Sequence, residues 1–391
     1  MEKPIKIKAE SLIVNSVWQR HILMFIIALI IFSGCAPKNE IDKCYEYLKN
    51  NGQSPKEYVI SKFKDYDYVF LGEYHRQKQD VDFVISLIPD LYNNGIRNIA
   101  YEFYQYENQS IVDSLLTAKE WDEKTLYHNI SKGMGIAWGY LEYLNLFKKI
   151  WEFNQTLNED QPKFRVVLLG YEYHPCKSGL ERFGGYDPDA FHADVFEKEI
   201  ISKNEKSLIY CGRHHAFTKY KQPVYDFEKD TLYELNNERF GNIIHGKFPK
   251  KTFNIFLHSP WVPNKGWDEQ WVKPVNGVID SIMDLMGNIP IGFDAKNTVM
   301  GKLKANDTYY AFGYEDFKLE DFCDGYIFLL PYKKVEFVSV VPNFYDEYNL
   351  SKLKDFWKCI GFTEDEHTIT IEEVVETFNY KPEDDFGDLM K

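Results

Sequence analysis

The residues best suited to chemistry form two short patterns with the same spacing. Residues 72–75 read GEYH and residues 212–215 read GRHH, so each pattern places a histidine three positions after a glycine. Imidazole and carboxylate groups can act as general bases on water, and an arginine can stabilise a developing oxyanion. The same imidazoles and carboxylates are ligands of zinc, manganese or cobalt, which make a bound water nucleophilic. Both chemistries are hydrolytic.

Short apolar runs that are typical of β-strands precede these residues. The strand candidates are 67–71, 97–103, 164–170, 207–211 and 252–257. Ionisable residues occur where each of these runs ends: Glu73 and His75 after the first, Glu102 in the second, His174 after the third, Arg213, His214 and His215 after the fourth, and His258 after the fifth. A single such histidine is more often a packed loop residue, but the recurrence of an ionisable residue at all five strand ends favours a common site.

The fold expected from the alternation of strands and helices is an α/β domain with a mostly parallel central sheet flanked by helices. Loops at the carboxyl ends of parallel strands meet at one rim, where ligands bind. We therefore expect His75 and His215 to share one pocket, and their placement on opposite sides of the molecule would contradict this. Four other histidines lie in helical or loop segments and are expected to have surface or packing roles: His128, His192, His245 and His367.

Taken together, the motifs resemble a known superfamily. The segments VFLGEYH, GIRNIAYEF, VVLLGYEYH and CGRHHAF are similar to the superfamily that joins erythromycin esterases, ChaN-type haem-binding lipoproteins and the TraB/Tiki metal-dependent peptidases. The resemblance covers roughly residues 60–260. Its hallmarks correspond here to Gly72 to His75, Glu102, and Gly212 to His215. Glu73 is most like the esterase and ChaN branches, whereas the doubled glycine–histidine pattern is most like the TraB/Tiki branch.

Each branch implies a different chemistry for these residues. The peptidase branch implies a divalent ion, Mn, Co or Zn, held by His75, Glu102 and His215. The esterase branch implies that His75 is a general base beside Glu73, with Glu102 and either Arg213 or His215 orienting the substrate and no metal required.

The ChaN branch implies haem binding instead. A histidine or tyrosine would then ligate the haem iron, and the candidates for cofactor binding are Tyr74, His174 and His214. The sequence leaves these branches open. We expect a hydrolase that cleaves an ester or amide bond in a small molecule or peptide, with a haem-binding lipoprotein as the alternative.

Other segments have expected places around the main domain, residues 61–345. The stretch 80–95 predicts an amphipathic helix that Pro89 kinks and Gly95 ends. The aromatic helical insertion 111–155 either roofs the cleft as a cap or fills core. The tryptophan-rich loop 261–271 either walls the site or packs on the domain, and 325–331 with 335–341 predict a late hairpin or edge pair. Residues 346–391 predict a helical extension with a solvated acidic tail.

The amino terminus, residues 1–35, predicts a lipoprotein-type signal segment. Basic residues precede the apolar run 22–32, which is too short to span a bilayer comfortably, and Ser33 and Gly34 precede Cys35. We expect lipidation of Cys35, a tether with a short helix over residues 36–60, attachment to the membrane and an extracytoplasmic place in the bacterial cell envelope. An uncleaved anchor is the alternative.

The composition and missing motifs exclude several classes of protein. The 391 residues are 44% hydrophobic and carry a net charge of −14, which predicts a globular core and no nucleic-acid partner. The sequence has no G-x-S-x-G, H-E-x-x-H or P-loop motif. Of its six cysteines, Cys35 is set aside, and the remaining odd number contains no C-x-x-C pair, so a zinc–thiolate site is not expected and at least one thiol stays unpaired.

Overall fold

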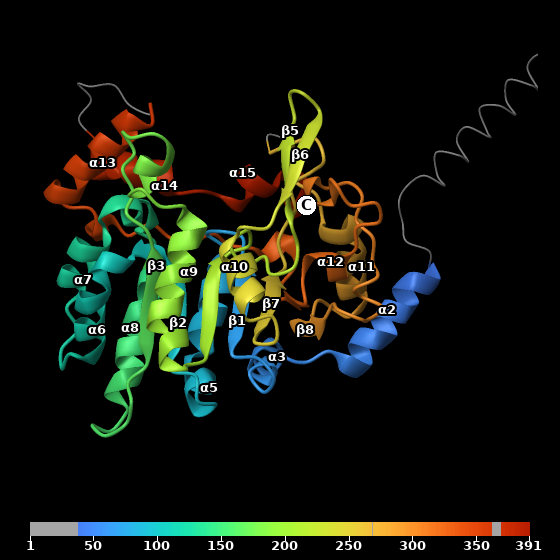
Figure 1. The fold of residues 1–391 in the computed structure, drawn as a ribbon, viewed down its shortest axis with the longest axis horizontal. Helices are drawn as coiled ribbons and strands as arrows, with labels where there is room; N and C mark the ends of the chain where they lie inside the picture. The colour runs from blue at the N-terminus through green and yellow to red at the C-terminus, as the bar shows by residue number, and fades with distance from the viewer. Residues whose placement is uncertain (1–37, 268, 362–368) are drawn as a thin grey trace, which may run out of the picture.

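The computed structural model describes residues 38–267, 269–361 and 369–391. Its centre is a seven-stranded sheet in the order β3-β2-β4-β1-β7-β9-β8 (Figure 1). The strands are β1 Tyr68–Glu73, β2 Asn98–Gln105, β3 Arg165–Gly170, β4 Ser207–Gly212, β7 Thr252–Leu257, β8 Ile291–Asp294 and β9 Gly325–Phe328. All neighbouring strands pair in parallel except β8, which is antiparallel to β9. The expected α/β fold and its five leading strands are confirmed.

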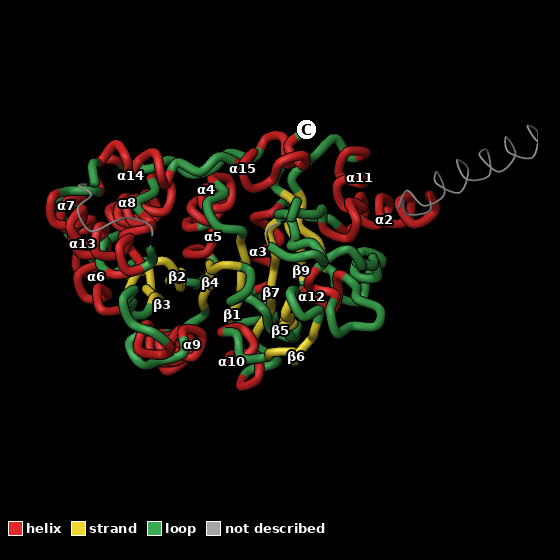
Figure 2. Tube along the Cα trace, turned by 90° about the horizontal axis from the view of Figure 1, so that it is seen from above, coloured by secondary structure: helices red, strands yellow, loops and turns green. Residues whose placement is uncertain are grey.

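Helices cover both faces of the sheet. On β1, Val69 and Leu71 belong to one buried cluster and Phe70 to the other, because successive side chains of a strand point to opposite faces. Helices α4 Lys78–Ser86, α5 Ile88–Asn93 and α8 Leu141–Gln155 lie on the first side, and α9 Pro188–Glu199 and α10 Phe240–Lys247 on the second (Figure 2).

The predicted helix over residues 80–95 is interrupted as expected. The chain forms α4 and then α5, with Leu87 between them and Pro89 in the first turn of α5. Gly95 follows with a φ of +86°, which ends the helix.

The predicted strand over residues 335–341 is wrong. This segment is a loop that makes isolated bridges from Phe337 to Gln77 and from Val340 to Tyr140. Its alternating burial, which gives it the sequence pattern of a strand, arises because it crosses the end of the sheet and buries Phe337 and Val341. The antiparallel partner of β9 is β8 instead.

The helical segment 111–155 mostly covers one face of the sheet. It contains α7 Glu123–Ile130, the 3₁₀ helix η2 Gly133–Trp138 and α8, and it begins within α6 Gln109–Thr117. Helices α6 and α8 pack against each other and against the β2–β3 side. Only its centre approaches the carboxyl ends of the strands, through Trp138 and Tyr143.

Residues 38–60 are folded, which corrects the expected tether. They form α2 Lys38–Asn51 and α3 Pro55–Lys62. Cys44 and Leu48, one helical turn apart, are buried on the side of α2 that contacts α11 Val278–Leu285, and Tyr58 of α3 donates a hydrogen bond to Asp294. The signal segment predicted for residues 1–35, Cys35 included, lies outside the described residues. Within the described part of the chain, no helix has the length and apolar character to cross a membrane.

The carboxyl-terminal extension is helical as predicted, but its end is not a solvated tail. It contains α13 Glu347–Cys359, α14 Ile371–Phe378, α15 Pro382–Phe386 and the 3₁₀ helix η9 Gly387–Met390. Phe386 is fully buried and packs against Tyr332 and Phe337, and Asp385 accepts a hydrogen bond from Tyr74. Glu383, Asp384 and Asp388 are exposed, whereas Asp385 and the buried Phe386 attach the segment to the domain.

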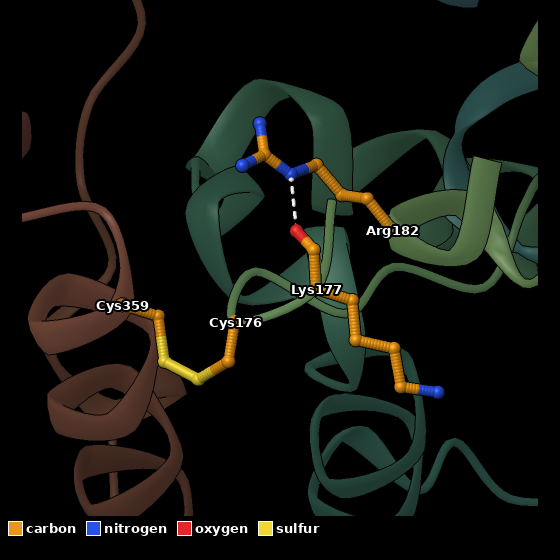
Figure 3. The surroundings of a disulfide bond; sticks show 4 residues. All are labelled: Cys176, Lys177, Arg182 and Cys359. Carbon is orange, nitrogen blue, oxygen red and sulfur yellow. Dashed lines mark hydrogen bonds between the residues drawn. A yellow bond between two sulfur atoms is a disulfide. The ribbon is translucent and has the colours of Figure 1, made fainter. Parts of the chain in front are cut away.

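Two features of the fold have no counterpart in the sequence analysis. A small hairpin of β5 Gln222–Asp226 and β6 Thr231–Asn236 projects beyond the sheet (Figure 1). A disulfide joins Cys176, in the loop after β3, to Cys359 at the end of α13 (Figure 3). The remaining described cysteines are free thiols, Cys44, Cys211 and Cys323, which confirms that at least one thiol is unpaired.

Candidate active site

The two glycine–histidine patterns meet at the carboxyl ends of neighbouring strands. β1 pairs with β4 so that Glu73 lies opposite Gly212. A cavity of about 340 Å³ opens there, and this volume lies in the range of small-molecule sites. It is lined by Glu73, Tyr74, His75, Arg76, Gly212, Arg213, His214, His215, Trp267, Trp271 and Tyr310. His75 and His215 therefore share one pocket.

Glu73 and His75 form the first functional pair. His75 Nδ1 lies 2.7 Å from Glu73 Oε1, and the side chain of His75 is 40% exposed whereas that of Glu73 is fully buried. Tyr143 of α8 donates to the Glu73 carboxylate at 2.9 Å, and Tyr210 of β4 also donates to it. Burial raises the pKa of Glu73, and the bonds from His75 and the two tyrosines oppose that rise.

His215 is held between two carboxylates. Its Nδ1 lies 2.6 Å from Asp189 Oδ1, and its Nε2 lies 3.3 Å from Glu102 Oε1. Asp189, in the first turn of α9, also accepts from Arg239 Nη1 at 3.1 Å and from the Phe240 amide at 2.8 Å. Because all of these groups have little contact with water, the charges act on one another strongly.

The charge on His215 follows from these contacts. Burial disfavours the imidazolium, but the carboxylates of Glu102 and Asp189 outweigh it and raise the pKa of His215 to about 9. In return, burial raises the pKa of Glu102 and Asp189, but the imidazolium outweighs it, so that the pKa values of both are lowered. At neutral pH the site thus holds a fixed cation beside the Glu73–His75 pair.

Gly212 allows the two halves of the site to touch. A Cβ at this position would lie 2.6 Å from Cε1 of His75, 3.0 Å from its Nε2 and 3.5 Å from Oε2 of Glu102. The Gly212 amide donates to that same Glu102 oxygen at 2.6 Å. Any side chain here would displace the His75 ring, so the glycine of the second pattern is explained by close approach.

The tryptophan-rich loop supplies part of the cavity wall. Trp267 and Trp271 line the cavity, whereas Trp261 is buried in the core. Both alternatives expected for this loop, a wall of the site and packing on the domain, therefore hold for different tryptophans. From the segment 111–155, Trp138 forms a T-shaped contact with His75, with ring centroids 5.1 Å apart, and Tyr143 bonds Glu73.

Three other predicted residues line the cavity: Arg213, His214 and Tyr74. The side chain of each already contacts another polar group of the protein. Arg213 donates to Ser259 Oγ at 3.2 Å and to the Pro260 carbonyl at 3.0 Å, so it holds the start of the tryptophan-rich loop. His214 Nε2 lies 2.9 Å from the Tyr310 hydroxyl, and burial with the nearby Arg213 charge lowers the pKa of His214 well below its usual range. Tyr74 is bonded to Asp385 at 3.0 Å.

Two predicted residues lie elsewhere. His174 forms an ion-pair contact with Glu172 at 3.0 Å and lines a different cavity, so the structure does not bring it to the site with Tyr74 and His214. His258 is buried in the core, where Nδ1 lies 3.0 Å from the Tyr326 hydroxyl and the ring stacks on Tyr332.

The sequence analysis misses the groups that support the two histidines. His192, assigned to a surface or packing role, is buried beside His215 with 5.1 Å between ring centroids, and neither of its ring nitrogens has a hydrogen-bond partner. Asp189 and His192 are three residues apart in α9, a spacing that puts both on one helix face and could have been noticed. Tyr143 and Tyr210 carry no such signal.

The donor set also bears on metal binding. Among the described residues, the ligand atoms of Asp189, His192 and His215 all lie within 4.8 Å of one another. The unpartnered nitrogens of buried His192 fit a cation, because imidazole is a common ligand of zinc and cobalt. The resemblance implies a different triad of His75, Glu102 and His215. The ligand atoms of these three residues do not all lie within this distance of one another.

Comparison with known families agrees with the motifs. Residues 59–158 match the family model described as haem-binding uptake, Tiki superfamily, ChaN. The predicted resemblance is confirmed over these residues, whereas the second pattern, residues 212–215, lies outside the match. The matched segment contains β1, α4, β2 and α8, and with them Glu73, His75 and Glu102. No curated protein matches the chain in sequence.

Several solved structures are similar at low identity. A mutant of the erythromycin esterase EreC in its open conformation is 10% identical, with 69% of this chain and 91% of that chain covered and a TM-score of 0.46. A succinoglycan biosynthesis protein is 10% identical over 75% of this chain and 97% of its own, with a TM-score of 0.48. ChaN of Campylobacter jejuni, which binds haem cofacially, is 13% identical over 54% and 88%, with a TM-score of 0.34.

Proposed function

We propose that this protein is a hydrolase that cleaves an ester or amide bond of a small molecule or peptide. The observation that carries the proposal is the Glu73–His75 pair, which opens onto a cavity whose other side holds the His215 cation. A base and a fixed positive charge in one pocket are the two groups that hydrolysis of a carbonyl compound requires.

In this mechanism Glu73 orients the base. Because His75 Nδ1 faces the carboxylate, Nε2 is the nitrogen that takes a proton from water as the water oxygen attacks the carbonyl carbon. Tyr143 and Tyr210 fix the carboxylate, so the imidazole keeps one tautomer and one orientation.

His215 stabilises the negative charge that develops. The oxygen of the tetrahedral intermediate becomes an anion, and His215 Nε2–H donates to it, since Nδ1 is bonded to Asp189 and the contact of Nε2 with Glu102 is longer, at 3.3 Å. When the intermediate collapses, the proton on His75 passes to the leaving alcohol or amine and the acid product remains. Arg213 acts as a positioning residue, since its guanidinium holds Pro260 and Ser259.

A divalent ion is an alternative to the His215 imidazolium in this role, because a histidine that ligates a metal is neutral. Asp189, His192 and His215 would hold it, and it would supply a Lewis acid beside the substrate carbonyl. Elemental analysis of the purified protein, with His192→Ala as the comparison, measures whether an ion is bound.

The direct test of the hydrolase uses aryl esters and amides as a substrate panel. We expect turnover of at least one substrate by the wild type, none above background by His75→Asn, and full activity in the matched control His128→Asn, which changes an exposed histidine of α7. Circular dichroism of each variant must match the wild type. Equal activity of His75→Asn and the wild type would refute the proposal.

Haem binding is the second candidate, favoured by the description of the matched family. Tyr74 and His214 are each tied to another side chain, so the half-exposed ring of His75 is the group best placed to ligate iron. Titration with haem tests this: a Soret shift that His75→Asn abolishes supports binding, and an unchanged spectrum contradicts it.

Anchoring to the bacterial cell envelope through lipidated Cys35 is part of the proposal. It is supported by the basic and apolar character of residues 1–35. Mass spectrometry of the protein from membranes should find Cys35 as the acylated amino terminus. An intact Met1, or an unmodified Cys35, would contradict it.

A further inference from the structure

We propose that a second cavity of this protein binds a small anion with an aromatic or apolar body. The cavity lies between the loop after β3, the segment from the end of α7 into η2, and α13. Its volume is about 410 Å³, larger than that of the active-site cavity. The two cavities have no lining residue in common.

The wall of this second cavity is largely apolar. Ile136 lines it from η2, Tyr173 and Pro175 from the loop after β3, and Tyr348 and Phe356 from α13. The rings of Tyr173 and Phe356 are 5.8 Å apart, which brings the loop and the helix together along one side. Aromatic walls of this kind favour a planar or hydrocarbon ligand of moderate size.

Three lysines also line the cavity, although the chain as a whole has a net charge of −14. Lys132 donates a hydrogen bond to the neutral Asn129 at 3.2 Å. Lys177 and Lys352 have no carboxylate partner among the described residues. Asp355 is the one carboxylate among the described residues that line the cavity. The surplus of positive charge favours an anionic ligand.

The disulfide fixes the distance between two walls of the second cavity. Cys176 lines the cavity and is bonded to Cys359 of α13, across a separation of 183 residues (Figure 3). The loop is held further by a hydrogen bond from Arg182 Nε to the Lys177 carbonyl at 3.0 Å and by one from the His174 amide to the Arg182 carbonyl at 2.7 Å. A preformed cavity loses less entropy when a ligand binds.

The helix η2 connects the second cavity to the active site. Gly133 and Ile136 line the second cavity, and Trp138, at the other end of η2, contacts the ring of His75. A ligand in the second cavity therefore rests on the same short helix that supports the proposed base.

The test uses 8-anilinonaphthalene-1-sulfonate, an aromatic anion whose fluorescence rises in an apolar site. Titration of the wild type should show saturable binding of one probe molecule per chain. The double variant K177E/K352E should bind the probe with an affinity at least about tenfold lower, because two attractive charges become repulsive. K43E/K49E, on exposed positions of α2, makes the same change in net charge and should bind like the wild type.

Two further variants locate the probe. Trp271→Ala alters the active-site cavity and should leave the affinity unchanged. The double variant C176S/C359S removes the tie between the walls and should weaken binding while the circular dichroism spectrum is kept. Equal affinity in K177E/K352E and the wild type, or loss of binding in Trp271→Ala, would overturn the proposal. These outcomes do not depend on whether the protein is a hydrolase.

Discussion

His75 and His215 occupy equivalent positions after neighbouring strands, yet their surroundings differ. His75 faces one carboxylate, Glu73, which is itself bonded by two tyrosines. His215 lies between two carboxylates, Glu102 and Asp189, and its pKa is raised to about 9. The two histidines differ in the number of carboxylates that contact them. They also differ in how many hydrogen bonds those carboxylates already accept from other groups.

This difference assigns separate roles to two chemically identical side chains. A histidine with one oriented nitrogen and an exposed ring is suited to moving a proton, whereas a histidine locked as a cation is suited to stabilising an anion. Repeated motifs at strand ends therefore need not repeat their function. Substitutions at the two positions should have distinct consequences.

The largest loss of catalytic rate is expected from substitution of His75, the proposed base. His75→Asn should lower kcat by roughly 10³-fold on a substrate of the wild type, because the asparagine amide cannot accept the proton of water. Initial rates with the wild type and His75→Asn provide the measurement. A loss below tenfold would show that His75 is not the base.

A smaller loss is expected at the cation. His215→Gln keeps a polar side chain but no charge, and kcat should fall by roughly 10²-fold with little change in KM, since the charge acts on the transition state. An increase in KM with kcat unchanged would assign His215 to substrate binding instead.

The same comparison predicts a pH-dependent stability. The folded-state pKa of His215 is about 9 and its ordinary value is 6.5, so its stabilising contribution is fully present below pH 6.5 and is lost as the pH rises through about 9. That contribution is at most about 3 kcal/mol. Urea unfolding at several pH values should show this decline in the wild type, and His215→Gln should lack it. Parallel curves for the two proteins would contradict the raised pKa.

The smallest loss of catalytic rate is expected from substitution of the tyrosines that donate hydrogen bonds to Glu73. Tyr210→Phe removes one hydrogen bond from a buried carboxylate and should destabilise the fold by about 1–3 kcal/mol and lower kcat by roughly tenfold. Tyr92→Phe, which loses one hydrogen bond to the Pro162 carbonyl far from the site, is the matched control and should retain its activity. Similar kcat losses in both variants would remove Tyr210 from the orienting network.

The sequence predicts the parts of this molecule that depend on local pattern. Five strands, the break in the helix before Pro89 and the meeting of residues 72–75 with 212–215 all follow from short-range rules applied to one parallel sheet. The rule that the carboxyl ends of parallel strands meet at one rim was sufficient to predict this meeting, because adjacent parallel strands end at the same rim.

The supporting groups could not be predicted in the same way. Tyr143 reaches the site from α8, and nothing in its neighbouring residues signals contact with Glu73. The spacing of Asp189 and His192 indicates a shared helix face, but it does not indicate that this face contacts His215. Segment 335–341 shows the reverse error, because its alternating burial arises from crossing the sheet and not from pairing within it. The carboxyl-terminal segment has the charge of a solvated tail, yet the buried Phe386 and the hydrogen bond from Tyr74 to Asp385 attach it to the domain.

The protonation state of His215 tests the central claim most directly. Nuclear magnetic resonance of protein with ¹³C-labelled histidine, with the signal assigned by its absence in His215→Gln, follows this one ring through a pH titration. We predict that His215 remains an imidazolium at pH 7.5 and loses its proton near pH 9. A titration midpoint at or below 6.5 would contradict the account.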